Sequence, residues 1–174
     1  MEKHFELTDE TIEVAGNTMH RIRCTRDCKW AKTGDLGGFI EKEDNLSGNA
    51  WVSDNARVYG NAWVSDNARV YGDARVYGNA RLAGDARVSG NARLAGKARV
   101  AGNDDHCGFD VFGSIGRHTH AYRTSDGGVE ITCGCFHGDI EAFEAKVRHT
   151  HGDSQYAREY LAIAHVIRVK FGLA

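Results

Sequence analysis

Residues 49–102 read NAWVSD NARVYG NAWVSD NARVYG DARVYG NARLAG DARVSG NARLAG KARVAG, which is one six-residue unit repeated nine times without interruption. Two divergent copies precede them, with Ile40 and Leu46 where the later units have Val or Leu. A period of six residues is too short for a helical or propeller repeat. It suits one short strand followed by one tight turn, the unit of a parallel β-helix. We therefore predict a β-helix over residues 37–102.

The alternation within each unit predicts which side chains form the core. Along a strand, successive side chains point to opposite faces, so Ala and the following Val or Leu point inward and the residues between them outward. If three units make one triangular coil, residues 18 positions apart stack on one another. The predicted core columns are then Leu46/Val64/Leu82/Val100, Val52/Val70/Val88 and Ile40/Val58/Val76/Leu94.

Two flanking segments differ from the repeats. Residues 1–36 contain Gly16-Asn17 between alternating apolar positions, which predicts a β-hairpin cap. Residues 103–174 contain two strand-like segments, RHTHAYRT and VEITCGCF, followed by two helices. The first helix is expected from near Asp139 to Gly152, and the second begins after Asp153 or Ser154. Its apolar stripe is predicted to comprise Tyr156, Tyr160, Ile163, Ile167 and Phe171.

The hexads resemble those of the hexapeptide-repeat, left-handed β-helix proteins. Over nearly the whole chain, FELTDETIEVAGNTMHRIRC, GDLGGFIEKEDNLSGNAWVSDNARVYGNA and the GCF…IEAFEAKV…HGD…REYLA tail resemble a family of phage and prophage proteins of this type. The expected fold is thus mainly β, a left-handed parallel β-helix with an N-terminal β-hairpin cap and a small α+β C-terminal domain. The resemblance implies origin and fold but no activity, because one fold serves many functions.

Composition bounds the environment and the partners. A net charge of −2 gives no overall attraction to nucleic acid or membrane. The five cysteines are an odd number, and the chain has neither a secretory signal nor a long apolar run. We expect a soluble, reduced protein of the bacterial cytoplasm with no membrane partner.

The resemblance also raises an enzymatic alternative. Many hexapeptide-repeat proteins are acyltransferases that use acyl-coenzyme A, and a few are carbonic anhydrases; both chemistries depend on histidine. None of the nine histidines lies within residues 37–102, and no loop interrupts residues 49–102. We expect no catalytic residue and no cofactor. In the alternative, an acyltransferase would depend on one of His106, His118, His120, His137, His149 or His151.

A second alternative is a zinc site in the C-terminal segment. Asp126-Gly127 predicts a two-residue type I′ hairpin, in which His120 faces Cys133 and His118 faces Cys135 on one side. Two imidazoles and two thiols make a Cys2His2 ligand set. A one-residue bulge would scatter these ligands, and the thiols would then pack as small apolar groups under the helices.

The outward residues of the repeats are the candidate binding surface. One face carries arginines beside tyrosines, and tryptophans lie on the other two; the candidate residues are Arg57, Tyr59, Arg75, Tyr77, Arg93, Trp51 and Trp63. Three interpretations fit: a solvated, self-neutralised surface, a protein-binding face, or a nucleotide or nucleic-acid site. We favour a non-catalytic phage or prophage accessory protein that binds a host protein, for example to block a defence protein. A homo-oligomer, with a trimer favoured, is also expected.

Overall fold

The computed structural model describes residues 3–174, which fall into two compact units divided between Asn103 and Asp104. The first unit comprises the N-terminal hairpin and the repeats, and the second comprises the C-terminal sheet and helices. None of the helices in the described residues is long and apolar enough to cross a membrane.

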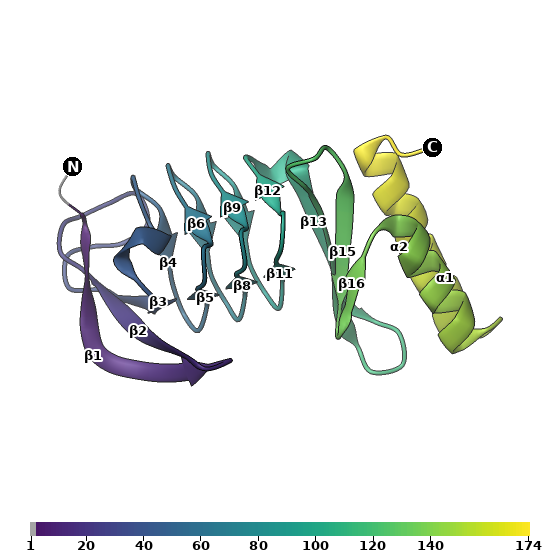
Figure 1. Cartoon of the computed structure of the whole chain (residues 1–174), viewed down its shortest axis with the longest axis horizontal. Helices are drawn as coiled ribbons and strands as arrows, with labels where there is room; N and C mark the ends of the chain where they lie inside the picture. Colours follow the sequence, from purple (N-terminus) through teal and green to yellow (C-terminus); the bar gives the residue numbers. More distant parts are fainter. Residues whose placement is uncertain (1–2) are drawn as a thin grey trace. The chain divides into compact units, whose positions relative to one another are not determined.

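The repeats form a β-solenoid in which each unit contributes one two-residue strand (Figure 1). The strands are β4 (Trp51–Val52), β5 (Arg57–Val58), β6 (Trp63–Val64), β7 (Arg69–Val70), β8 (Arg75–Val76), β9 (Arg81–Leu82), β10 (Arg87–Val88), β11 (Arg93–Leu94) and β12 (Arg99–Val100). They build three parallel sheets. Sheet II is β4-β7-β10, sheet III is β6-β9-β12, and β5-β8-β11 continue sheet I, which begins in the N-terminal segment.

The register confirms the predicted 18-residue stacking. Val58 pairs with Val76, which pairs with Leu94, and the other two columns follow the same rule. Every Val, Leu and Ile of the three predicted columns is at most 1% exposed. The alanine two residues earlier in each unit is buried as well, so the core is a column of aliphatic side chains without a polar group among them.

The corners between strands need a left-handed residue, which explains the glycine in most units. Gly60, Gly72 and Gly78 have φ between 67° and 68°, and the structure gives Asp54 and Asp66 nearly the same conformation, at 58° and 57°. Each of these two aspartates accepts a hydrogen bond from the backbone N–H one coil further on, at 3.0 Å. The side-chain bond offsets part of the cost of a left-handed non-glycine residue.

The N-terminal hairpin extends sheet I. Strands β1 (Phe5–Val14) and β2 (Asn17–Cys24) are antiparallel, β2 pairs with β3 (Leu36–Ile40), and β3 pairs in parallel with β5. The predicted hairpin is confirmed, although its turn lies one residue earlier, at Ala15-Gly16, where both residues have positive φ. A short 3-10 helix, η1 (Glu43–Asn45), follows β3.

Glycines let β3 approach the first coil closely. A Cβ on Gly37 would lie 2.5 Å from the Val52 carbonyl oxygen, and one on Gly38 would lie 2.6 Å from the Ala56 carbonyl oxygen. Because both obstacles are backbone atoms, neither can be moved by a change of rotamer. The Gly-Gly pair therefore fixes how the chain enters the solenoid.

The second unit is a four-stranded antiparallel sheet covered on one face by two helices (Figure 1). The short helix η2 (Asn103–Asp105) precedes the sheet, which has the order β13 (His106–Phe112), β14 (Arg117–Arg123), β15 (Val129–Cys133) and β16 (Phe136–Gly138). The predicted hairpin corresponds to β14 and β15. Strands β13 and β16 were not predicted; β16 is only three residues long, and β13 is irregular, with a register shift between Phe109 and Phe112.

The helices confirm the predicted caps. Helix α1 (Ile140–His151) begins at Asp139, whose side chain accepts the Ala142 N–H, and ends at Gly152 with a positive φ. Helix α2 (Gln155–Phe171) begins at Ser154. Four of the five predicted α2 stripe residues are buried against the sheet, whereas Tyr156 is 41% exposed.

Candidate binding surface of the solenoid

Sheet I presents the arginine column that the repeat phase predicts. Arg57, Arg75 and Arg93 are direct neighbours on β5, β8 and β11, and all three are partly buried along their stems. The column continues into the N-terminal segment, because Phe39 pairs with Arg57 and the Arg21 guanidinium lies 4.5 Å from the Phe39 ring. We call Arg57, Arg75 and Arg93 the arginine column.

Two tyrosines lie beside the arginine column. The rings of Tyr59 and Tyr77 are stacked, with centroids 5.2 Å apart and planes at 6°. Partial burial, followed by the neighbouring Tyr77, raises the pKa of Tyr59, against the opposite effect of the arginines. The phenol is therefore neutral at physiological pH. The tyrosine pair and the guanidinium groups form a surface with flat aromatic faces and planar hydrogen-bond donors.

The charges of Arg57 and Arg75 are not balanced by a carboxylate within the described residues. Arg21, beside the column, forms an ion pair with Glu10 at 2.9 Å. Within the described residues, neither Arg57 nor Arg75 forms an ion pair, and the buried Nε of Arg57 has no hydrogen-bond partner. The corner carboxylates have other partners: Asp54 and Asp66 bind backbone N–H groups, and Asp85 binds Lys29 at 2.8 Å. Like charges on adjacent strands repel, so an anionic or aromatic partner would be stabilised here.

Sheet II is covered by the chain itself, which corrects the prediction for Trp51. Trp51 is only 2% exposed; His4 lies over it, with ring centroids 6.0 Å apart, and the His4 Nε2 is 3.0 Å from the Ala50 carbonyl. Side-chain alternation correctly placed Trp51 outside the core column. The preceding N-terminal segment folds over that side, so Trp51 is not available to a partner.

Trp30, which the sequence did not single out, covers the rest of sheet II. Its ring lies 4.9 Å from the Arg87 guanidinium and 5.6 Å from that of Arg69, and its Nε1 donates to the Asn67 carbonyl at 2.8 Å. Lys29 beside it forms the ion pair with Asp85. A single tryptophan among lysines, outside the repeats, gave no periodic signal. The segment shows how an aromatic group binds the arginines of this solenoid.

Sheet III is open. Trp63 is 37% exposed and lies under the Arg81 guanidinium at 5.5 Å, while Arg99 continues the ladder toward β12. Of the candidate residues, those of sheet I and Trp63 are thus accessible in this unit. They lie on two different sheets and do not form one continuous patch.

The predicted Cys2His2 set is not brought together. The structure pairs His120 with Thr132 and Thr119 with Cys133, so Cys133 lies on the helix-covered face and the two histidines on the opposite face. The cause is a three-residue loop, Ser125 to Gly127, closed by the Thr124–Gly128 hydrogen bond, in place of the expected two-residue turn. One residue of difference reverses every side chain. No group of His, Cys, Asp or Glu within residues 3–174 is arranged to hold a metal ion.

The histidines of the sheet in the second unit contact their own neighbours. His106 Nδ1 lies 3.0 Å from His120 Nε2, His118 binds Asp110, and His137 binds Glu130 at 2.8 Å. Burial lowers the pKa of His106 and lowers that of His120 well below 6.5, with the neighbouring histidines adding to the second shift. His120 is therefore neutral at pH 7.

Comparison with known proteins agrees with the repeat architecture. Residues 50–66, 63–78 and 68–86 match a family model described as the YdcK β-solenoid repeat. No curated protein matches the chain. The matched segments are thus similar to that repeat, and the stacked coils form a parallel β-solenoid.

Proposed function

We propose that the protein is a non-catalytic binding protein that recognises a partner protein through sheet I of its solenoid. The observation that carries this proposal is the arginine column with its stacked Tyr59–Tyr77 pair, in which Arg57 and Arg75 have no acidic partner among the described residues. Arg and Tyr are the residues that most often dominate protein interfaces. A rigid column orders them before binding, which lowers the entropic cost of association.

The contacts of Trp30 with the arginines of sheet II support recognition of arginines by an aromatic partner on sheet I. On sheet II, the Trp30 ring lies against the Arg69 and Arg87 guanidinium groups, and Asp85 pairs with Lys29. Sheet I has the same repeat but no covering segment. A partner with exposed carboxylates and an aromatic side chain would reproduce these contacts there. In line with the resemblance to phage and prophage proteins, the proposed partner is a bacterial host protein, such as a defence protein that is blocked by binding.

Affinity purification from bacterial lysate, followed by mass spectrometry, tests the proposal. The double variant Arg57→Glu, Arg75→Glu should lose the partner, because it makes the column acidic. The matched control Arg81→Glu, Arg99→Glu changes the charge identically on sheet III and should keep it. Equal retention by both double variants, or equal loss, would contradict recognition through sheet I.

Acetyl-coenzyme A distinguishes binding from transfer. Because the repeats contain no histidine, we expect no change in melting temperature with this cofactor. A ligand at about 100 times its dissociation constant would add roughly 2.7 kcal/mol of stability, which a thermal scan detects. A clear shift together with one indispensable histidine would replace the binding proposal with an acyltransferase.

The same surface is proposed to support self-association, with a trimer favoured. Tyr59→Glu would weaken a homo-oligomer without unfolding it, because the ring lies outside the core column. Light scattering of the wild type checks this expectation, and a particle of 19.1 kDa at micromolar concentration would rule the oligomer out.

A further inference from the structure

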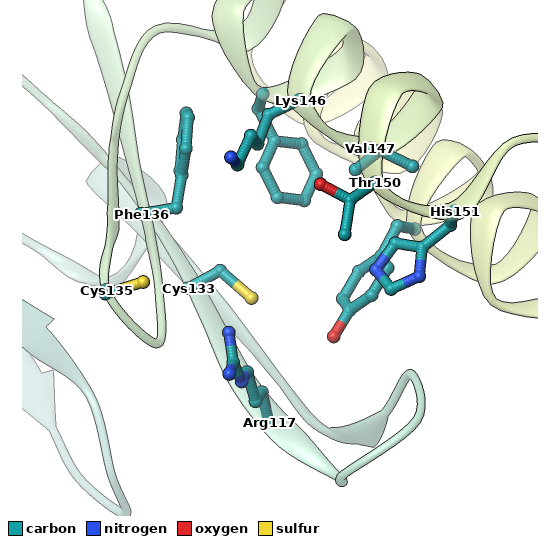
Figure 2. A pocket seen from close by; sticks show the side chains of 10 residues that line it. Arg117, Cys133, Cys135, Phe136, Lys146, Val147, Thr150 and His151 are labelled. Carbon is teal, nitrogen blue, oxygen red and sulfur yellow. The ribbon is translucent and has the colours of Figure 1, made fainter.

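The second unit contains a small pocket between the end of the sheet and the helices (Figure 2). Its volume is about 90 Å³, which is smaller than the roughly 150 Å³ of an engineered cavity that binds benzene. Phe136, Phe143 and Val147 supply an apolar wall. The pocket can therefore enclose a small ligand or one end of a larger one.

The charged groups around this pocket are all basic. Arg117 from β14 and Lys146 from α1 line it from opposite sides, as Figure 2 shows, and His151 lines it from the end of α1. No Asp or Glu is among the lining residues, and within residues 3–174 neither Arg117 nor Lys146 forms an ion pair. The nearby Glu159 is held by the Gly113 N–H and by Gln155. The positive charge is therefore left uncompensated.

Arg117 packs against a tight turn. Cys133 pairs with Phe136 across a two-residue turn, Gly134-Cys135, in which Gly134 has a φ of 60°. A Cβ on Gly134 would lie 2.6 Å from the Arg117 Nη1, so the guanidinium packs directly on the glycine, between the two cysteines. Both thiols line the pocket, Cys135 exposed and Cys133 buried.

Hydroxyl groups complete the polar side of the pocket. Burial, and then the neighbouring Cys133, raise the pKa of Tyr160 to about 12, so its phenol stays neutral and donates to the Phe112 carbonyl at 3.3 Å. The His151 ring stacks on Tyr160, with centroids 5.6 Å apart. Thr150 lines the rim. These groups add no negative charge at physiological pH.

We propose that this pocket binds a small organic carboxylate. The carboxylate would lie between Arg117 and Lys146, and the apolar part of the ligand would lie against Phe136 and Phe143. Two cations that flank an apolar wall match an amphiphilic anion, because the guanidinium fork binds carboxylate well and the aromatic rings exclude water. The site is independent of the solenoid surface, and its loss would leave recognition through sheet I unchanged.

Cys135 provides a probe for the charge of the pocket. Iodoacetate and iodoacetamide differ mainly in charge, and both alkylate a thiol in the same way. The sulfur forms a bond to the CH₂ carbon, the carbon–iodine bond breaks, iodide leaves and the thiol proton passes to solvent. The rate ratio at Cys135 is the rate with iodoacetate divided by the rate with iodoacetamide, both followed by peptide mass spectrometry. This ratio measures how strongly the site attracts a carboxylate.

The rate ratio at Cys135 in the native protein should exceed the ratio in urea by roughly three- to tenfold. This is the effect expected when a positive charge lies a few ångströms from the reagent carboxylate near a protein surface. Arg117→Gln and Lys146→Gln should each reduce the excess. Lys170→Gln, which removes the same charge outside the pocket, should preserve it. Lys146 is exposed on α1, so that variant remains informative even if Arg117→Gln disturbs the Gly134 turn.

Ligand protection separates a true site from a positive surface. Benzoate should slow the reaction of Cys135 with iodoacetamide in the wild-type protein and fail to do so in Lys146→Gln, while benzyl alcohol should have little effect on either. Equal rate ratios in native and urea-denatured protein would overturn the proposal. A charge effect without benzoate protection would also overturn it, because it would show attraction without a binding pocket.

Discussion

The solenoid and the C-terminal sheet place their side chains by different means. In the solenoid, each coil repeats the phase of the previous one, so Val58, Val76 and Leu94 report the same inward position three times. In the C-terminal sheet, the face of every residue on β15 depends on one loop, Ser125 to Gly127. A wrong inward or outward assignment in one coil would conflict with the neighbouring coils. A wrong length for the loop would instead reverse the assigned face of every residue on β15.

The same difference separates the two kinds of candidate site. The arginine column arises from the repeat period and needs no knowledge of loop geometry. The pocket of the second unit requires a turn, two helix faces and a glycine to converge. Repetition therefore makes a surface predictable, and convergence makes a pocket chemically specific.

The strongest test of the solenoid is a charge in its core. Val76→Asp should destabilise the first unit by about 3–5 kcal/mol, because an unpaired carboxylate in an aliphatic column has no partner. Val76 is 0% exposed and pairs with Val58 and Leu94. Arg75→Ala, one residue away and pointing outward, should change stability little in urea unfolding. Equal losses for the two variants would contradict the inward and outward assignment.

Acid should destabilise the second unit. Because burial lowers the pKa of His106 and of His120, the folded unit binds fewer protons than the unfolded chain below pH 6.5. The contribution of these two histidines to the free energy of unfolding is fully present above about pH 6.5. It is lost as the pH falls, by about 1.4 kcal/mol per pH unit for each histidine. The α-helical signal at 222 nm, from α1 and α2, follows this unit in thermal scans at pH 7.5 and 5.5. His120→Asn should flatten the dependence, whereas the exposed His149→Asn should not.

The junction of the hairpin with the solenoid is expected to be intolerant of a single methyl group. Gly38→Ala should cost about 1–3 kcal/mol, because the added Cβ would lie 2.6 Å from the Ala56 carbonyl oxygen. Gly102→Ala is the matched control, since its Cβ would meet nothing within 4 Å. Comparable melting temperatures for the two variants would mean that β3 does not enter the first coil as described.

The smallest effect is expected at the corners. Asp66→Ala removes the hydrogen bond to the Gly84 N–H and leaves alanine with a φ of 57°, at a cost of about 1–2 kcal/mol. Asp66→Gly should cost less, because glycine adopts this conformation freely. Differential scanning calorimetry of the two variants separates the loss of the hydrogen bond from the cost of the left-handed backbone conformation. If Asp66→Gly were less stable than Asp66→Ala, the left-handed conformation would not explain the cost.

Sequence reasoning succeeded where one physical rule applies many times. The 18-residue stacking, the arginine column and the caps at Asp139 and Ser154 follow from side-chain alternation and hydrogen bonding within a few residues. Burial of Trp51 could not be predicted, because it depends on a segment more than 40 residues away in sequence that folds over it. The pocket could not be predicted either, since it joins β14, the Cys133–Phe136 turn and both helices.

The N-terminal hairpin has a consequence for growth of the solenoid. A stack of near-identical coils offers its end as a template for further strands, and an open edge of this kind invites fibre formation. On sheet I, that end is occupied by β2 and then by β1, whose sequence FELTDETIEV carries four carboxylates and whose pairing shifts between Leu7 and Thr11. Glu6 and Glu10 are ion-paired with arginines of β2, so a second copy of β1 approaching this edge would meet an irregular ladder and the carboxylates of Asp9 and Glu13. We therefore expect the hairpin to keep sheet I from pairing with further strands at the β1 edge.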